Sequence, residues 1–68
     1  MLRFEITGEY IELIKLLKVL QIAESGAMAK ALVENEKVLR NGEIETRKRA
    51  KICKGETIQV LGKTIVTC

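Results

Sequence analysis

Four cations stand within five residues in the second half of the chain, in the segment Arg47-Lys48-Arg49-Ala50-Lys51. No acid separates them. Like charges this close repel one another, so such a segment is tolerated most easily where it meets a polyanion or stays fully solvated. Arginine suits a phosphate-bearing partner, because its planar guanidinium can hold two oxygens of one phosphate. The segment therefore indicates an anion-binding surface, with a solvated loop as the alternative.

Charge is divided unevenly along the chain. Residues 1–36 carry four basic and six acidic side chains, whereas residues 37–68 carry eight basic and three acidic ones. Two of these acids, Glu43 and Glu45, are close enough in sequence to pair with Arg47 or Lys48 and so to aim the loop. We therefore expect any anionic partner to be bound mainly by the second half.

The sequence contains few of the residues that usually carry out catalysis or bind metal ions. It contains no histidine, the side chain most used for proton transfer near neutral pH and a common zinc ligand. Its two cysteines, Cys53 and Cys68, form neither a Cys-x-x-Cys pair nor a dense disulfide framework, so we expect reduced thiols, with Cys53 packed as a small apolar residue. The sequence predicts a protein that is not an enzyme and has no cofactor and no metal site.

Length and composition predict one small domain, residues 1–68. The 68 residues are 47% apolar and 31% charged, without proline or a low-complexity tract, which favours a globular chain over a disordered one. Phe4 and Tyr10 are the only aromatic residues, so the core must be aliphatic. The N-terminus lacks the apolar core of a signal peptide, and the longest apolar stretch, residues 11–23, is interrupted by charges. We therefore expect a cytoplasmic protein.

Two helices should follow a short first strand. Residues 2–6 alternate apolar and polar side chains, which is typical of a half-buried strand. From about Glu9 to residue 22 charged residues recur at every third position among leucines and isoleucines, which predicts a helix with most of its circumference buried. Ser25 is a natural N-cap for a second helix that ends at Asn35, a residue that tolerates the left-handed conformation. Only two or three residues would join the two helices.

Beyond residue 36 the pattern predicts two β-hairpins. Asn41-Gly42 favours a type I′ turn, which needs positive φ at both central residues, and it would join residues 37–40 to 43–46. A second hairpin would pair residues 57–61 with 64–67 around Gly62-Lys63. The basic segment would form the loop that connects the two hairpins.

These elements predict an α+β fold, in which a helix hairpin packs on a small, bent, mainly antiparallel sheet. In such a fold the Asn41-Gly42 turn and the basic loop lie near the mouth of a groove between the second helix and the sheet. Lys30, Lys37 and the loop cations would then share one rim of that groove.

The order of elements and the residues within them resemble the S-four RNA-binding domain, also called the alpha-L motif. The resemblance covers about residues 9–61 and depends on joint order and spacing. The matching stretches are Leu13, Leu16 and Leu17, then Ser25-Gly26-x-x-Ala29-Lys30-x-Leu32-Val33, then Val38-x-x-Asn41-Gly42-x-x-Glu45-x-Arg47, and finally Lys54-Gly55-Glu56-Thr57-Ile58-x-Val60. The chain is most similar to the subgroup in which this domain is the entire protein.

The resemblance implies a non-catalytic RNA-binding protein that contacts the backbone of structured RNA, such as ribosomal or transfer RNA. The RNA-binding residues that it implies are Ser25, Lys30, Lys37, Arg47, Lys48, Arg49 and Lys51. Ser25 could instead serve only as a cap, and Lys30 could form a surface pair with Glu34. The chain departs from the family pattern at Glu12 and Gly26, where many members have arginine, and at Glu36, where glycine is frequent. These departures would shift RNA contacts toward the loop.

Two other functions stay open at this point. The helix pair could be a helix-turn-helix-like DNA binder, although its second helix offers few cations to a groove. The chain could instead be a protein–protein interaction module in which Glu5, Glu9 and Glu12 dock a basic partner.

Overall fold

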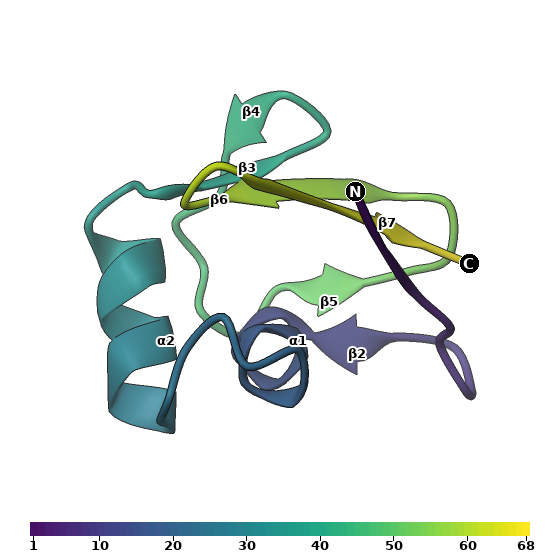
Figure 1. The fold of residues 1–68 in the computed structure, drawn as a ribbon, viewed down its shortest axis with the longest axis horizontal. Coiled ribbons are helices and arrows are strands. Elements are labelled where there is room, and N and C mark those ends of the chain that lie inside the picture. Colours follow the sequence, from purple (N-terminus) through teal and green to yellow (C-terminus); the bar gives the residue numbers. More distant parts are fainter.

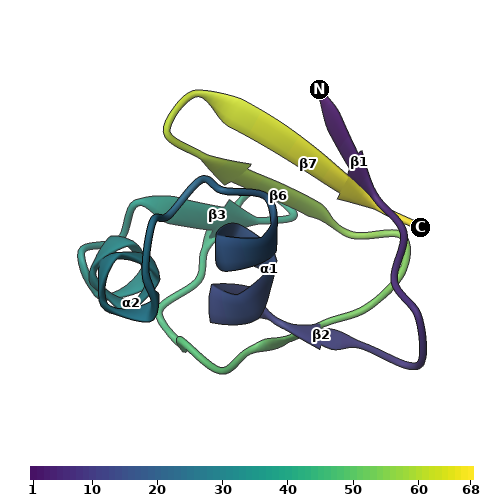
Figure 2. The ribbon, with the colours of Figure 1, turned by 60° about the horizontal axis from the view of Figure 1, so that its bottom comes forward.

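Both helices and a short β-ribbon lie on one side of a bent five-stranded sheet in the computed structural model, which describes residues 1–68 (Figures 1 and 2). The elements are β1 (Leu2–Phe4), β2 (Ile11–Glu12), α1 (Leu13–Val19), α2 (Gly26–Glu34), β3 (Val38–Arg40), β4 (Glu43–Ile44), β5 (Lys51–Ile52), β6 (Thr57–Val60) and β7 (Lys63–Thr67). Neither helix is long and apolar enough to cross a bilayer.

The large sheet has the strand order β1-β7-β6-β3-β4, and β2 and β5 form a separate antiparallel ribbon. All neighbours in the large sheet are antiparallel except β1 and β7, which run parallel with Leu2 opposite Ile65. This parallel edge makes the sheet mixed. The α+β class, with two helices on a mainly antiparallel sheet, is confirmed.

The core is aliphatic and is built on α1. Leu13, Leu16 and Leu17, spaced so that they share one helix face, are fully buried. They belong to one cluster with Ala29, Val33, Val38, Ile52, Ile58, Val60 and Ile65, among others. The cluster contains no aromatic side chain; Phe4 is partly buried and packs against its edge. α1 thereby joins the sheet, α2 and the ribbon in one core, which fixes the positions of the surface loops.

The first helix is shorter than the sequence predicts. It begins at Leu13 instead of Glu9, because Ile11 and Glu12 pair with Ile52 and Lys51 in the ribbon. It ends at Val19, and residues 20–25 connect it to α2, a longer connection than expected. Ile22 and Ala23 stay buried in this connection. The strand β5 was also unforeseen, since a two-residue strand leaves almost no pattern in the sequence.

Three left-handed residues define how α2 ends and how the second hairpin turns. Asn35 has an ordinary φ of −90°, and Glu36, with φ of 59°, takes the left-handed position predicted for Asn35. The second hairpin turns at Leu61 and Gly62, with φ of 49° and 74°, one residue earlier than predicted, so that Val60 pairs with Lys63.

The Asn41-Gly42 turn is confirmed. Both residues have positive φ, 52° and 86°, as a type I′ turn requires. Arg40 and Glu43 pair across it. The turn therefore holds β4 at the edge of the sheet, beside the start of the basic segment.

Candidate nucleic-acid interface

The first turn of α1 anchors the basic segment. The backbone N–H of Leu13 donates to the carbonyl oxygen of Ala50 at 2.9 Å, and that of Ile14 donates to the carbonyl oxygen of Lys48 at 3.3 Å. The first N–H groups of a helix have no partner within the helix. Here the carbonyl oxygens of the loop accept their hydrogen bonds, in place of a capping side chain. Ala50 is itself buried. The loop backbone is therefore fixed at two points while its charged side chains face outward.

Lys51 belongs to β5 instead of the loop, and it lies opposite Glu12 of β2. Its Nζ lies 5.0 Å from the centroid of the Tyr10 ring, within the range of a cation–π contact. Tyr10 precedes β2 and so lies outside the first helix, which the sequence predicted to begin at about Glu9. The contact occupies one face of the only tyrosine.

Two carboxylates enclose Arg40 of β3. Its Nε and Nη2 donate to the two oxygens of Glu56 at 2.6 and 3.0 Å, and its Nη1 donates to Oε1 of Glu45 at 3.1 Å. Nη2 also donates to the carbonyl oxygen of Lys51 at 2.8 Å. The bonds to Glu56 raise the pKa of Arg40, and the bonds from Arg40 lower the pKa of Glu56. This paired fork geometry gives strong and specific contacts, so Arg40 connects the hairpin to β5.

Arg47, one of the predicted RNA contacts, is also paired. Its Nε and Nη2 donate to Glu45 at 3.1 and 3.3 Å, and its backbone N–H donates to Oε2 at 3.1 Å. These bonds from Arg47, followed by the bond from Arg40, lower the pKa of Glu45 to about 2. The expected pairing of Glu45 with Arg47 is confirmed, whereas Glu43 makes no ion pair. The Arg47 side chain is still 74% exposed.

The network continues into the Asn41-Gly42 turn. Oδ1 of Asn41 accepts from the backbone N–H of Thr57 at 2.9 Å, and Nδ2 donates to Glu56 at 3.1 Å. Glu56 also accepts from the backbone N–H of Cys53. Arg40 and Glu56 were not predicted as residues of the site, because they lie 16 residues apart and share no local pattern. The one available signal was that Glu56 is an isolated acid in a basic half.

Lys30 of α2 and Lys48 of the loop come together. The segment between β4 and β5 passes beside α2 in both views (Figures 1 and 2). The neighbouring Lys30 ammonium is the main cause that lowers the pKa of Lys48, and Arg49 lowers it further, while Glu34 opposes this shift. Lys30 forms no ion pair with Glu34. Lys30 of α2 therefore lies near Lys48, with Arg49 close by, but no hollow is lined by residues of α2, so the expected groove between the second helix and the sheet is not found.

A shallow hollow of about 390 Å³ is lined mainly by residues that adjoin Lys48 in the sequence. It is lined by Arg40, Arg47, Arg49, Ala50 and Lys51, which come from β3, the loop and β5. We call it the arginine hollow. Every lining residue except Ala50 carries a positive charge, so the hollow can receive an anion.

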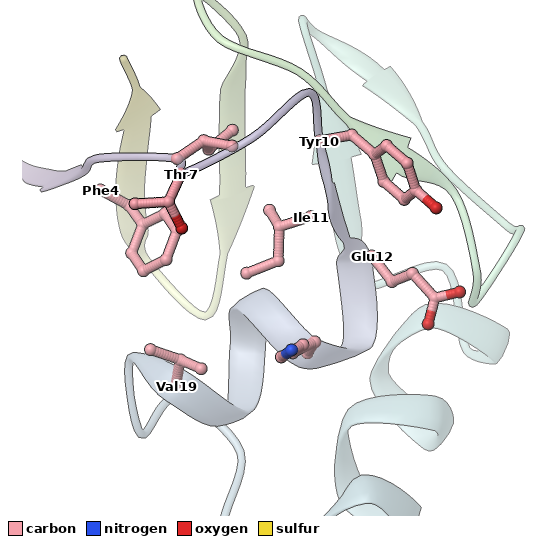
Figure 3. Close-up of a pocket in the computed structure, with 8 residues that line it drawn as sticks. Phe4, Thr7, Tyr10, Ile11, Glu12 and Val19 are labelled. Atoms are coloured by element: carbon pink, nitrogen blue, oxygen red, sulfur yellow. The ribbon is translucent and has the colours of Figure 1, made fainter.

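The largest groove of the molecule has different chemistry. It measures about 540 Å³ and lies between the N-terminal segment, β2 and α1. Phe4 and Val19 flank one end, Tyr10 and Glu12 the other, and Ile11 lies between them (Figure 3). Lys15 is its one cation. A mostly apolar groove with one acid and one base offers little to a polyanion.

The family model of the S4 domain matches residues 4–67. The chain belongs to the S4 domain family. The protein YbcJ of Escherichia coli (strain K12) is 41% identical over 56 residues, which cover 82% of this chain and 80% of YbcJ. YbcJ of Shigella flexneri matches with the same identity and coverage.

The fold of this S4 domain is also similar to a solved structure. The solution structure of YbcJ from E. coli superimposes with a TM-score of 0.75 and 37% identity, and the match covers 98% of this chain and 86% of that one. That structure is described as revealing an alpha-L motif involved in RNA binding. The resemblance inferred from the sequence is thereby confirmed.

The residues predicted to bind RNA do not all meet on this S4 domain. Lys30, Lys48 and Arg49 converge, and Arg47, Arg49 and Lys51 line the arginine hollow. The Ser25 hydroxyl accepts from the backbone N–H of Met28 at 3.2 Å, so Ser25 is the expected N-cap. Lys37 lies beyond the C-terminal end of α2 and lines none of the hollows. The RNA-binding role of each residue stays a prediction.

The cysteines of the S4 domain are both free and exposed. The expected burial of Cys53 is therefore wrong. Its backbone N–H and carbonyl oxygen are bound by Glu56 and by the Thr67 hydroxyl, and this places the residue at a surface turn. No group of three or more cysteine or acidic side chains gathers in a way that could hold a metal ion.

Proposed function

We propose that this chain is a non-catalytic RNA-binding domain, spanning residues 1–68, that acts in the cytoplasm on a structured RNA of the ribosomal or transfer type. The sugar–phosphate backbone is contacted by Lys30, Lys48, Arg49 and Lys51. Arg47 adds a contact through the guanidinium N–H groups that Glu45 does not occupy. The observation that carries the proposal is that α1 anchors the loop backbone at Lys48 and Ala50, beside a hollow lined by Arg49 and Lys51 and near Lys30, and that none of these four cations has an ion-paired carboxylate. Two ammonium groups held together in this way are stabilised when a phosphate binds between them.

Phosphate binding explains why the cations are held in place before the partner arrives. Cations that neutralise phosphates release condensed counterions, which supplies most of the sequence-independent affinity for a nucleic acid. The loop backbone is already fixed by α1, so binding orders little additional chain. Family membership and the RNA-binding description of YbcJ agree with RNA as the polyanion.

Shape, more than base identity, should select the RNA. The chain has one phenylalanine and one tyrosine; Phe4 is partly buried and Tyr10 is in contact with Lys51. Single-strand binders use exposed aromatic side chains on which bases stack. A surface of cations with a single aromatic side chain at its margin suits a folded or double-stranded RNA, recognised through its phosphates and 2′-hydroxyls.

The acids of the site support binding without catalysis. Hydrogen bonds from arginines lower the pKa values of Glu45 and Glu56. At neutral pH both carboxylates are ionised and occupied, whereas a general acid or base works best with a pKa near the working pH. Their role in the proposal is to position Arg40 and Arg47.

A triple variant that replaces three cations of the surface with neutral glutamine tests the proposal. Lys30→Gln, Lys48→Gln and Arg49→Gln together should lower the affinity for a transfer RNA or a ribosomal RNA fragment by about 100-fold near 0.1 M salt, since three phosphate contacts are removed. Fluorescence anisotropy measures the affinity, and circular dichroism verifies the fold. A matched triple variant, Arg3→Gln, Lys15→Gln and Lys63→Gln, loses the same charge elsewhere and should bind within a few-fold of the parent. Equal losses in both variants would reject the assigned surface.

A further inference from the structure

The arginine hollow differs from the rest of the basic surface because two of its three arginines are already oriented. The guanidinium of Arg40 is held by Glu45, Glu56 and the Lys51 carbonyl oxygen, and that of Arg47 by Glu45. The side chain of Arg40 is only 22% exposed. A ligand that enters the hollow therefore meets donors whose orientation costs little further entropy.

Both oriented arginines keep unused N–H groups. Arginine has five N–H donors. Arg40 uses four of them, which leaves one on Nη1, and Arg47 uses two, on Nε and Nη2, which leaves both on Nη1 and one on Nη2. Arg49 and Lys51 line the same hollow and form no ion pair. Arg40, Arg47 and Arg49, which keep unused donors, thus line one hollow, and its fourth cation, Lys51, also contacts the Tyr10 ring.

The charge balance favours an anion with two negative charges. Four cations line the hollow, and two carboxylates, Glu45 and Glu56, are paired with them. The lining cations and their ion-paired carboxylates together carry a net charge of two positive, while the unpaired Glu43 lines a neighbouring hollow that shares Arg40 and Arg47. An internal phosphate of RNA carries one negative charge, whereas a phosphomonoester carries about −1.5 to −2 at neutral pH and has three acceptor oxygens.

We propose that the arginine hollow binds a terminal phosphate of RNA, a phosphomonoester at a chain end, in preference to an internal phosphodiester. This inference rests on the proposed RNA-binding function and names a specific feature of the RNA. The hollow, at about 390 Å³, has room for the phosphate with part of its nucleotide. Its single apolar lining residue, Ala50, is buried and offers no stacking surface. Recognition is of the charged end and does not depend on the base.

The test compares one RNA hairpin in three forms, with a 5′-phosphate, with a 3′-phosphate, or with hydroxyls at both ends. The phosphorylated form that fits the hollow should bind about tenfold more tightly than the dihydroxyl form, because it adds charge-assisted hydrogen bonds. Arg49→Gln with Lys51→Gln should reduce this ratio to about one. The matched variant Lys54→Gln with Lys63→Gln, outside the hollow, should retain the ratio. The two phosphorylated arms identify which end is recognised.

A titration without RNA separates this inference from the proposed function. Uridine 5′-monophosphate should shift the amide NMR signals of Ala50 and Lys51, and uridine should not. Equal affinity for all three hairpins overturns the preference for a terminal phosphate and leaves RNA binding intact. Loss of all RNA binding, with the nucleotide still shifting these signals, overturns the proposed function and supports an anion site in the hollow. If the protein neither binds RNA nor shows nucleotide-induced shifts of these signals, both the proposed function and the anion site in the hollow are overturned.

Discussion

At the scale of residues, the cations of the basic half divide into two kinds. Arg40 and Arg47 donate to Glu45 and Glu56 and hold the hairpin against β5. Lys48, Arg49 and Lys51 have no carboxylate partner. Glu45 and Glu56 orient these two arginines, as the sequence predicted for Glu45 and Arg47. Substitution of Arg47 therefore acts on stability as well as on binding.

The stability of the fold should depend on the charge of Glu45. Its pKa is lowered from 4.5 to about 2, so the native state stabilises the ionised form. That stabilisation is present above about pH 4.5 and is lost as the pH falls toward 2, and this shift corresponds to about 3 kcal/mol. Arg40 stays protonated over this range. We expect the free energy of unfolding, from urea titrations, to fall by a few kcal/mol between these pH values.

Glu45→Gln isolates this contribution. The variant should lose about 2 kcal/mol at neutral pH, because a neutral amide replaces a carboxylate that accepts charged hydrogen bonds, and its stability should change less below pH 4.5. Glu43→Gln removes an exposed acid without an ion pair and should follow the parent curve. If Glu45→Gln shows the same acid dependence as the parent, the assignment to Glu45 is wrong.

At the scale of elements, the sequence predicts what is encoded locally. Ser25 caps α2, Asn41-Gly42 turns the first hairpin, and the leucine spacing identifies the buried face of α1. The ribbon of β2 and β5 was missed because it pairs residues about 40 positions apart. The start of α1 was missed for the same reason. Glu12 makes no side-chain cap bond, and loop carbonyls satisfy the first N–H groups instead.

The end of α2 contains a position that glycine should improve. Glu36 has φ of 59° and is exposed, without an ion pair. Non-glycine residues are strained in this region, whereas glycine adopts it freely. Glu36→Gly should therefore stabilise the protein by about 0.5–1 kcal/mol, and Tm should rise by a few degrees in a thermal melt. Ala31→Gly, at an exposed position in the interior of α2, should destabilise by about 1 kcal/mol. A lower Tm for Glu36→Gly would contradict this account.

At the scale of the whole molecule, the fold gathers cations that the sequence separates. Lys30 lies in the acidic half of the chain and reaches the basic loop because α2 packs beside it. The run of residues 47–51 could be identified from the sequence because it is local. Its division into bound and free cations could not, since Arg40 and Glu56 meet only in the folded sheet. The extent of the candidate site is therefore a property of the tertiary structure.

The number of free cations sets the salt dependence of RNA binding. Four cations of the proposed surface have no ion pair, namely Lys30, Lys48, Arg49 and Lys51. At about 0.7–0.9 per phosphate contact, log affinity should fall with log salt at a slope near −3. Participation of Arg47 and Lys37 as full phosphate contacts would instead give a slope of about −5. Anisotropy titrations of one RNA at several salt concentrations between about 0.05 and 0.2 M measure the slope.

Two single variants then distinguish free cations from paired ones. Lys48→Gln should make the slope shallower by about one, because it removes one phosphate contact. Arg47→Gln should change the slope by less than this, because the Arg47 charge is already balanced by Glu45, whereas the free energy of unfolding should fall. Equal changes of slope in the two variants would mean that RNA displaces Glu45 from Arg47 on binding, and the fixed network would then be a feature of the free protein alone.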